Sequence, residues 1–589
     1  RHAESASARA STVKPRTDAP IAAGPQPCEK AIATAVGKHG YTADQIAAAY
    51  GLSSFYAAGD LGAGQTVAVL SLEPLLPADI ETFQACYDTH TKVIMKTVGK
   101  GPGPYEGEDD ETALDVEQLI GLAPRSRVLV YQTQNSGTAE ARILSAWVSQ
   151  DTAAVMTSSW GRCEERTSEE RASTTDFLLQ EAAAQGQTFF VASGDWGSTD
   201  CYTPNHGDLN KALQIDFPSG DPFATAVGGT RLEKPTDPAP IEYLWNETPK
   251  WGAGGGGISE FFPMPAYQRT ARSSLNVLGP LSSGAPCGHI ARYCRQIPDV
   301  SADAAPQTGY VVHSEEAWDV TGGTSAGAPF WAALVALINA SPACDGDSIG
   351  FANPALYEIG GSAYAANFRD VTGPRPRGMP TINIFDASRP FPAGPGYDMA
   401  TGIGTPLGGA LGSSLCALLQ PPAPTPPAPS PSAPTSPSAP APPSPSSAAP
   451  PAHSPARVVH SHLAGLATGK PRLTVTVAAR EDARIDAATL TLPAGLTAAK
   501  AKKDLTAGIV ARDPSGHRLT ARPQGAGRII RVGFPGQTRV TLSVGPPAFV
   551  IAPRLRSQLR GGRAHRMRFV VVTRESDGPG ARFPLSLGA

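Results

Sequence analysis

The chain has 589 residues, of which 41% are hydrophobic and 17% are charged, and its formal net charge is −3. The composition is that of a globular protein rather than a disordered one, and the length exceeds what one hydrophobic core usually fills, so we expect two domains. No apolar run reaches the length of a membrane span. The numbering begins at Arg1 without Met, which indicates a processed form or a missing upstream segment.

Residues 1–35 are rich in Ala, Ser, Pro and charge and predict a flexible lead-in. From Tyr41 the pattern becomes helical, and buried-type strands then alternate with helices. The predicted strands are Thr66–Glu73, Arg127–Thr133, Ala153–Gly161 and Thr188–Asp195, and the predicted helices are Glu111–Leu122, Glu140–Val148 and Ser168–Gln185. This alternation predicts an α/β fold with a doubly wound, mostly parallel sheet, whose site lies at the carboxyl ends of the strands.

The predicted helix at 111–122 begins in an acidic run and ends before Pro124. Glu111 and Asp115 are four residues apart and therefore share one helix face. Two carboxyls that are close and partly desolvated titrate as a coupled pair, with one proton held to higher pH. Taken alone, the acidic run is also typical of a solvated helix start.

The segment VASGDWGSTDC, Val191–Cys201, ends a hydrophobic strand in a Gly-Asp turn. Asp195 would then lie at the carboxyl end of a strand, where a protonated carboxyl could donate a hydrogen bond to an oxyanion. The alternative is an ordinary Asx turn.

In VTGGTSAGAPFWAALVALINA, Val320–Ala340, a Gly-rich turn places Ser325 at the start of an apolar helix. Free backbone N–H groups at that point suit a nucleophile that builds negative charge on a carbonyl, although a Ser in this position is also a common helix cap. The eleven histidines are scattered and none has the glycine-rich helix start of a catalytic histidine, so a Ser-His-Asp triad is poorly supported. We expect the base for Ser325 not to be histidine.

Together these segments resemble the sedolisin family of serine-carboxyl peptidases, whose members are acid-active and subtilisin-folded and are usually made with a removable propeptide. The matching motifs are ExxxD at Glu111 and Asp115, SGD at Asp195, GGTSAGAP at Ser325, and the late pair FRDVTG and GPGYDMATGIGTP. The resemblance covers roughly Tyr41 to Leu419.

The resemblance implies that Ser325 is the nucleophile, Glu111 the general base, Asp115 its proton-sharing partner, and Asp195 the acid of the oxyanion site. It predicts a secreted, acid-active serine-type endopeptidase that acts on polypeptides, and it leaves tripeptidyl-peptidase activity open. The glycine run Gly254–Gly257 is expected to leave backbone edges free to pair with an extended substrate.

The late pair implies one structural calcium ion. Asp370 and Asp398 would supply carboxylates, and Val371, Gly394 and Gly396 would supply carbonyls, an all-oxygen set that suits a hard cation. Two ordinary turns are the alternative.

All eight cysteines precede residue 421, and their even number without a CxxC metal pattern predicts disulfides and an oxidising, extracellular location. Cys163 and Cys201 follow two strands that can meet if they are neighbours, and Cys287 and Cys294 can close a small loop. The simplest remaining pairs are Cys28–Cys86 and Cys344–Cys416. Spacing alone does not fix the pairing.

We therefore expect a peptidase domain at 36–420, a Pro/Ala/Ser-rich linker at 421–456, and a small all-β sandwich domain at 457–589. Residues 457–589 contain 22 Lys+Arg and 7 Asp+Glu, a charge of +15, whereas residues 1–456 carry −18. The basic domain is predicted to bind an anionic cell-wall or surface polymer, and neither nucleic acid nor a stable oligomer is expected, so the chain would be a monomer. The alternative function is a non-catalytic cell-surface or cell-wall binding protein that uses this domain.

Overall fold

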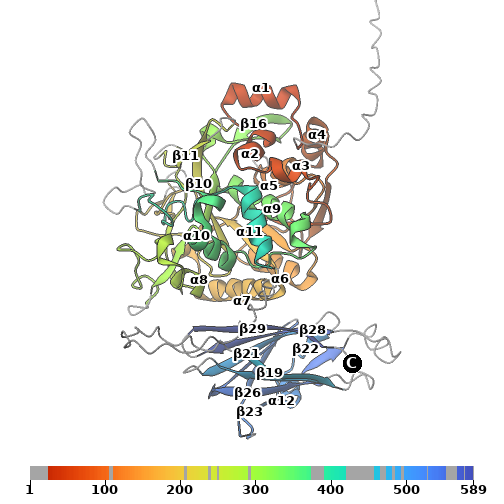
Figure 1. Cartoon of the computed structure of the whole chain (residues 1–589). Helices are drawn as coiled ribbons and strands as arrows, with labels where there is room; N and C mark the ends of the chain where they lie inside the picture. The colour runs from red at the N-terminus through yellow and green to blue at the C-terminus, as the bar shows by residue number, and fades with distance from the viewer. Residues whose placement is uncertain are drawn as a thin grey trace, which may run out of the picture.

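The computed structural model describes residues 24–587, except for residues 105–109, 204–207, 236–239, 248–250, 289–292, 373–390, 420–456, 465–471, 480–483, 493–495, 516, 527, 552–566 and 576–577. The whole predicted linker, 421–456, therefore lies outside the described residues. The described chain forms an α/β body followed by a separate set of antiparallel sheets, drawn in blue in Figure 1.

An eight-stranded, mostly parallel sheet is the centre of the α/β body. Its order is β11-β10-β6-β4-β1-β3-β2, with β14 also paired to β10, and only the β10–β11 pairing is antiparallel. The strands are β1 Thr66–Ser71, β2 Lys92–Thr97, β3 Arg127–Gln132, β4 Val155–Ser158, β6 Thr188–Ala192, β10 Thr225–Glu233, β11 Ile241–Leu244 and β14 Val300–Asp303. The four strands predicted from the sequence, and the predicted parallel sheet, are confirmed.

Helices cover both faces of this sheet (Figure 1). The helices of the body are α1 Glu29–Lys38, α2 Ala43–Ala49, α3 Ser53–Ala57, α4 Pro77–Tyr87, α5 Glu111–Leu122, α6 Ala139–Gln150, α7 Glu169–Gln185, α8 Ala266–Arg269, α9 Thr324–Ala340, α10 Asn353–Asn367 and α11 Gly408–Ala417. The prediction for α5 is confirmed to the residue, because acidic residues begin that helix and Pro124 follows it.

Strand alternation divides the core into two layers. Val67 and Val69 of β1 join the cluster of α5 and α9, whereas Ala68 and Leu70 join the cluster of α6 and α7 on the other face. Both layers are fully buried, so every central strand is apolar on both sides, as expected for a parallel sheet between helices. Helix α9 is buried along nearly its whole length, which fixes the position of its first turn.

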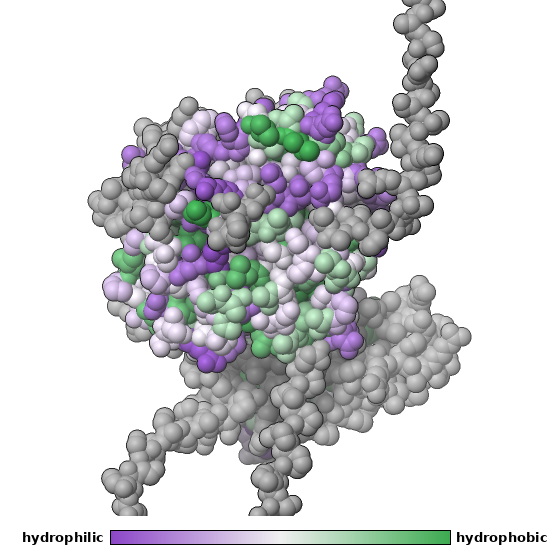
Figure 2. Space-filling model, turned by 45° about the horizontal axis from the view of Figure 1, so that its top comes forward, coloured by the Kyte–Doolittle hydropathy of each residue, from purple (hydrophilic) through white to green (hydrophobic). Residues whose placement is uncertain are grey.

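The predicted lead-in through residue 35 is wrong from Glu29 onward, since α1 begins there. Buried Ala31 and Ala35 pack this helix against Val311, and the Cys28–Cys86 disulfide ties its start to α4. Its outer face is apolar in part: Ile32 and Val36 are 47% and 74% exposed, and hydrophobic colour lies at the top of Figure 2 over this helix.

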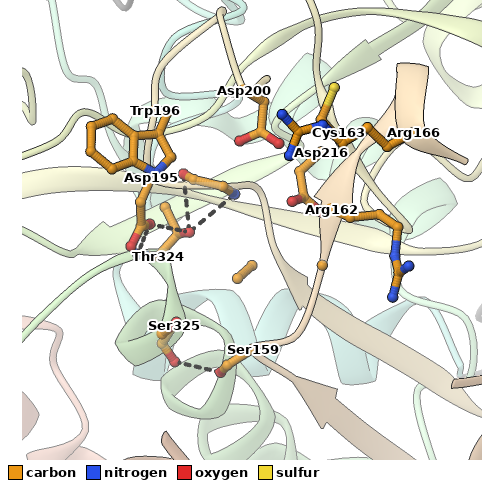
Figure 3. A pocket seen from close by; sticks show the side chains of 13 residues that line it. Ser159, Arg162, Cys163, Arg166, Asp195, Trp196, Asp200, Asp216, Thr324 and Ser325 are labelled. Atoms are coloured by element: carbon orange, nitrogen blue, oxygen red, sulfur yellow. Dashed lines mark hydrogen bonds between the residues drawn. The ribbon is translucent and has the colours of Figure 1, made fainter. Parts of the chain in front are cut away.

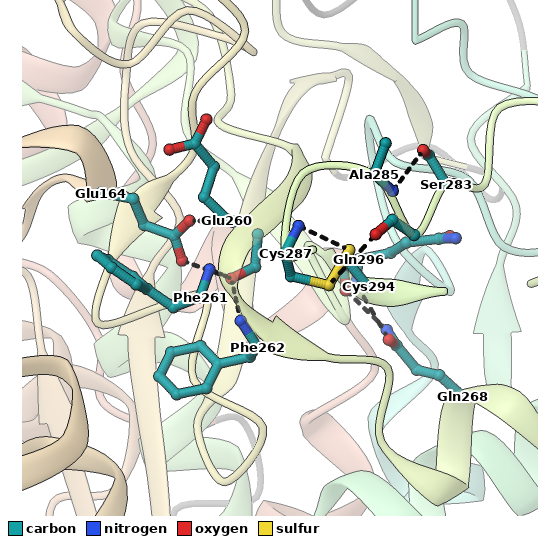
Figure 4. Close-up of a disulfide and its surroundings, with 12 residues drawn as sticks. Glu164, Glu260, Phe261, Phe262, Gln268, Ser283, Ala285, Cys287, Cys294 and Gln296 are labelled. Atoms are coloured by element: carbon teal, nitrogen blue, oxygen red, sulfur yellow. Dashed lines mark hydrogen bonds between the residues drawn. A yellow bond between two sulfur atoms is a disulfide. The ribbon is translucent and has the colours of Figure 1, made fainter. Parts of the chain in front are cut away.

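All four predicted disulfides are confirmed. They are Cys28–Cys86, Cys163–Cys201, Cys287–Cys294 and Cys344–Cys416. The second joins the segments that follow β4 and β6, which are neighbours in the sheet as the prediction required. The third closes the short loop before β13 (Cys294–Ile297), where the backbone N–H of Cys287 also points at the sulfur of Cys294 (Figure 4).

The C-terminal region is a β-sandwich, as predicted. One antiparallel sheet has the order β19-β20-β26-β23, the other has the order β24-β25-β21-β28-β29, and they share one hydrophobic core. Their strands are β19 Arg457–Ala464, β20 Arg472–Ala478, β21 Ile485–Thr491, β23 Ile509–Arg512, β24 Arg522–Ala526, β25 Ile529–Gln537, β26 Arg539–Val544, β28 Met567–Glu575 and β29 Gly578–Leu587. Among the described residues, no helix is both long and apolar enough to cross a membrane.

Candidate active site

Ser325 is the second residue of α9 and lies at its N-terminal end, where the helix leaves backbone N–H groups unpaired. Gly323 precedes the helix with φ of 89°, and a Cβ at that position would lie 2.5 Å from Oδ2 of Asp195. Only glycine therefore fits between the serine turn and that carboxyl. Ser325 is 9% exposed, so its hydroxyl is almost enclosed.

Glu111 is the carboxyl that meets this hydroxyl. Helix α5 packs along α9, which brings the Ser325 hydroxyl next to Glu111, where it acts to lower the pKa of that carboxyl. Burial, followed by the charge of Asp115, raises the pKa of Glu111 well above its usual value. Burial likewise raises the pKa of Asp115, against a hydrogen bond from the hydroxyl of Ser159 at 2.6 Å. The two carboxyls are thus a buried pair that retains a proton well above pH 4.

Asp195 follows β6 and faces the first turn of α9. Its Oδ1 accepts hydrogen bonds from the backbone N–H and the hydroxyl of Thr324, both at 2.8 Å. Burial raises the pKa of Asp195. Its second oxygen, next to Gly323, is the one that could donate a proton to a substrate oxygen at the N-terminus of α9.

The four residues predicted from the motifs therefore meet in one place, from three elements far apart in the sequence. Figure 3 shows Ser325 below Asp195 and Thr324, on the side of the site where Ser159 approaches. The geometry can supply a nucleophilic hydroxyl, a buried carboxyl base and a protonated carboxyl donor, the three functions needed for acyl transfer without histidine.

Glu73 belongs to this site and was missed from the sequence. It follows β1, and its Oε1 accepts a hydrogen bond of 2.7 Å from the backbone N–H of Thr112 at the start of α5. Its charge raises the pKa of both Glu111 and Asp115. The sequence did contain a signal for Glu73. It is the last residue of the predicted strand Thr66–Glu73, and sites in such sheets lie at the carboxyl ends of the strands.

The glycine run does not leave its edge free at Gly254 and Gly255, so that prediction is wrong there. Their backbone N–H groups donate to the carbonyls of Trp245 and Gly194 at 3.1 and 2.7 Å. A Cβ on Gly255 would lie 1.9 Å from the carbonyl oxygen of Ser193. The glycines are needed because this segment packs backbone to backbone against the loop that carries Asp195.

The proposed calcium ligands also lie close together. Asp370 accepts a hydrogen bond from Gly396 N–H at 3.2 Å, and Asp398 accepts one from Gly394 N–H at 2.8 Å. The hydroxyl of Tyr364 lies within 3.4 Å of Asp370 Oδ1 and of the carbonyl oxygens of Gly396 and Ile403. The cluster is all oxygen, and burial raises the pKa of Asp398 to about 7. The residues present fit a hard divalent cation. The chain between the two halves of this cluster, residues 373–390, lies outside the described residues.

A cavity of about 330 Å³ opens beside Ser325 and is bounded on its near side by Asp195, Thr324 and Ser159. Its inner end lies among side chains that the motif analysis did not single out (Figure 3).

The Subtilase family profile matches residues 103–346. Kumamolisin of Bacillus sp. (strain MN-32) is 35% identical over 308 residues, which cover 52% of this chain and 50% of that protein. Tripeptidyl-peptidase 1 of Canis lupus familiaris is 30% identical over 418 residues, 67% of each chain. The chain thus spans about half to two thirds of the length of these relatives.

A similar fold is found in Pseudomonas sedolisin (serine-carboxyl proteinase), solved in complex with two molecules of pseudo-iodotyrostatin. The match has a TM-score of 0.53 at 24% identity and covers 64% of this chain and 98% of that one. The residues matched by the family profile, 103–346, contain the four residues described above. The chain belongs to the sedolisin family of serine-carboxyl peptidases.

Proposed function

We propose that the protein is an acid-active serine-carboxyl peptidase that hydrolyses peptide bonds of polypeptides. The observation that carries the proposal is that the Ser325 hydroxyl lies beside the buried carboxyl of Glu111, at the N-terminus of the helix next to which Asp195 is fixed. The membership of the chain in a peptidase family supports the same activity.

In the first step, the Ser325 oxygen forms a bond to the substrate carbonyl carbon while its proton passes to Glu111. Asp195 donates a hydrogen bond to the carbonyl oxygen as it becomes an oxyanion. Collapse of this intermediate breaks the carbon–nitrogen bond, and Glu111 returns the proton to the departing amine. A water molecule then repeats the sequence on the acyl-enzyme and restores Ser325.

An acidic optimum follows from two requirements. Asp195 must hold its proton to act as a donor, which limits activity at high pH. Glu111 must be ionised to accept the serine proton, and Asp115 retains the shared proton that allows this ionisation in a buried site. Digestion of casein between pH 3 and 7, with Ser325→Ala as the control, tests the proposal, and equal digestion by the variant would overturn it.

We further propose that Asp370, Asp398, Val371, Gly394 and Gly396 hold a structural calcium ion. The oxygen-only cluster supports this assignment. The ion would stabilise the loops that follow α10.

The protein is proposed to be secreted, on the basis of four disulfides, and to act as a monomer. The +15 charge of residues 457–589 supports binding of that region to an anionic cell-wall or surface polymer. Retention of the full chain on anionic cell walls, lost in high salt, tests this binding. A purely non-catalytic binding function is disfavoured because Ser325 and the buried Glu111 carboxyl lie next to each other.

A further inference from the structure

One sheet of the C-terminal sandwich presents arginines and hydroxyls on its outer face. The leucine and valines of β20 belong to the sandwich core and alternate with Arg472 and Thr474, which therefore point to the other side of the sheet. In β26 the core valines and leucine alternate in the same way with Arg539 and Thr541. Strand β23 ends in Arg512, directly after an alanine of the core. The outer face of β20, β26 and β23 is therefore polar and basic.

Four hydroxyls on this face form two pairs across neighbouring strands. Those of Thr474 and Ser543 are 2.9 Å apart, and those of Thr476 and Thr541 are 2.8 Å apart. In each pair one hydroxyl donates to the other, which leaves one hydrogen and free lone pairs for a ligand. The two pairs are two residues apart along each strand, or about 7 Å. They form a short row of donors and acceptors that runs along the strands.

Arginines lie at both ends of this row. At one end, a Cβ on Gly545 would lie 3.3 Å from Cζ of Arg472, so this guanidinium lies over the backbone of the neighbouring chain. At the other end, Arg512 pairs with Thr541, two residues from Arg539. The two arginines are therefore diagonal neighbours, about 7–8 Å apart. All three arginines are exposed, and β20, β26 and β23 contain no Asp or Glu.

The second sheet of the sandwich faces the catalytic body instead. Strand β28 contacts α7, whereas β26 and β23 lie on the far side of the sandwich (Figure 1). Nη1 of Arg528 lies 3.8 Å from Oδ2 of Asp151, which follows α6. Burial raises the pKa of Asp176 in α7 to about 6, and the nearby charge of Arg531 opposes this rise. The arginines of that sheet thus meet carboxyls of the same chain, and the face that points away from the body is the one suited to an external partner.

The chemistry of this outer face fits a polymer that carries both anionic groups and hydroxyls. Guanidinium forks bind the paired oxygens of carboxylate or sulfate groups, and hydroxyl pairs exchange hydrogen bonds with sugar hydroxyls. Residues 457–589 contain no Trp and no Tyr, so neither of these rings can stack on a sugar and recognition depends on charge and hydroxyls. A neutral polysaccharide would leave the arginines unused, and a polyphosphate would leave the hydroxyls unused.

We propose that the outer face of β20, β26 and β23 binds an acidic polysaccharide, a sugar polymer that carries carboxylate or sulfate groups. The polymer lies along the strands, with anionic groups at the arginines and hydroxyls against the two hydroxyl pairs. Arg539 pairs with Ala478, so it lies about 20 Å along the strand from Arg472, which suits a segment of several sugars rather than one terminal sugar. The inference rests on the polymer binding proposed above and names its surface and the class of polymer.

Binding is tested with the full-length chain carrying Ser325→Ala, which prevents self-digestion. The probes are heparin, a sulfated polysaccharide, and polygalacturonate, a carboxylated one, in low salt at pH 6. Arg512→Gln with Arg539→Gln should weaken the binding of both by about 3- to 30-fold, as expected for two exposed ionic contacts. The matched control, Arg528→Gln with Arg531→Gln, removes the same charge from the sheet that faces the body and should keep the parent affinity. Melting midpoints of both variants, compared with the parent, check that the sandwich still folds.

A second pair of substitutions separates recognition of sugar from attraction of charge. Thr476→Val with Thr541→Val removes both hydroxyls of one pair together, so neither is left without its partner, and valine suits a strand. The double variant should bind heparin and polygalacturonate more weakly than the parent does. Its affinity for inorganic polyphosphate, which has no sugar hydroxyls, should be unchanged.

Each outcome separates this inference from the functions proposed above. Equal losses in the two arginine variants would show that net charge rather than this face drives binding, and would leave the proposed polymer binding standing. Polyphosphate or DNA bound as tightly as heparin, with no effect of the valine substitutions, would overturn the polysaccharide assignment. No binding of the parent chain to either polysaccharide would also overturn it, and retention on anionic cell walls would then show whether polymer binding itself fails. The arginine variants with Ser325 intact should digest casein as the wild type does, so the peptidase function is judged independently.

Discussion

The hydroxyl of Ser159 lies 2.6 Å from Oδ1 of Asp115, and it lies 3.0 Å from the carbonyl oxygen of Ser325. That carbonyl lacks its helical donor, because the residue four positions later is Pro329, which has no N–H. A hydroxyl has one hydrogen and can satisfy one acceptor at a time. When Asp115 is ionised, Ser159 donates to Asp115. When Asp115 holds its proton, Ser159 can donate to the carbonyl of the nucleophile instead, so its orientation follows the protonation of the catalytic pair.

Substitution of Ser159 should therefore alter the pH profile as well as the rate. Ser159→Ala removes a donor that lowers the pKa of Asp115, so Asp115 should hold the shared proton to higher pH and the alkaline limb of kcat/KM should move to higher pH, with a loss of about tenfold at the optimum. Ser159→Thr retains the hydroxyl and should restore most of the profile. A profile of Ser159→Ala that keeps the wild-type shape would show that Ser159 has no part in the titration.

The role of Asp195 as a hydrogen-bond donor to the oxyanion can be tested by replacing it with a donor that does not titrate. In Asp195→Asn, the side-chain oxygen can still accept from the N–H and hydroxyl of Thr324, which places the amide NH₂ where the proton of Asp195 would lie. This donor does not titrate. We expect the Asn variant to lose less activity than Asp195→Ala, which should fall about 10²- to 10³-fold, and to keep its activity further toward neutral pH. Equal losses in the two variants at every pH would argue against an oxyanion role.

Much of the fold could be predicted because its signals are local. Helix α5 has an acidic start and a proline stop, and the four central strands are continuous apolar runs. The three catalytic motifs could be placed because each lies where an element begins or ends. The resemblance then supplied roles that the local pattern left open, since each motif alone also fits an ordinary cap or turn.

The parts that were missed depend on which strand ends become neighbours. Glu73 and Ser159 come from separate connections, after β1 and after β4, that meet only because these two strands are neighbours in the sheet. Sequence spacing does not give that order. The glycine run was misassigned for the same reason, since its close backbone partner, Gly194, lies about 60 residues away.

Removal of calcium should destabilise the catalytic body. Binding to the native state alone contributes about 2.7 kcal/mol when free calcium is a hundred times its dissociation constant. Thermal melts at pH 6 with and without chelator should show a lower midpoint without the metal. Asp398→Ala should melt at one midpoint in both conditions, whereas Asp347→Ala, an exposed aspartate outside the cluster, should retain the chelator effect. If the chelator lowers the melting midpoint of Asp398→Ala as much as that of the wild type, calcium does not bind at this cluster.

The catalytic body should be more stable at mildly acidic pH than at neutral pH, because many of its buried carboxyls have raised pKa values. Burial raises the pKa of Glu164 to about 8, that of Asp200 to about 7 and that of Glu181 to about 7, and it also raises the pKa values of Glu111 and Asp115. Between about pH 4 and 8 the folded chain therefore binds more protons than the unfolded chain. Stability is then full below the unfolded pKa values and declines as the pH rises through the folded ones.

Glu164, which takes no part in the proposed reaction, allows the pH dependence of folding stability to be tested separately from catalysis. Its carboxyl accepts hydrogen bonds from the hydroxyl of Ser259 and the N–H of Glu260 at 2.7 and 2.6 Å (Figure 4), and it is fully buried. Glu164→Gln cannot ionise, so the fall in melting temperature between pH 5 and 8 should be smaller in this variant than in the wild type. Glu165→Gln, at the exposed neighbouring position, should keep the wild-type fall. Denaturant unfolding at pH 5, 6.5 and 8, with Ser325→Ala as the background, compares the stabilities of these variants without self-digestion. A free energy of unfolding that rises from pH 5 to pH 8 without the Glu164 substitution would contradict the assignment of protonated carboxyls to the core.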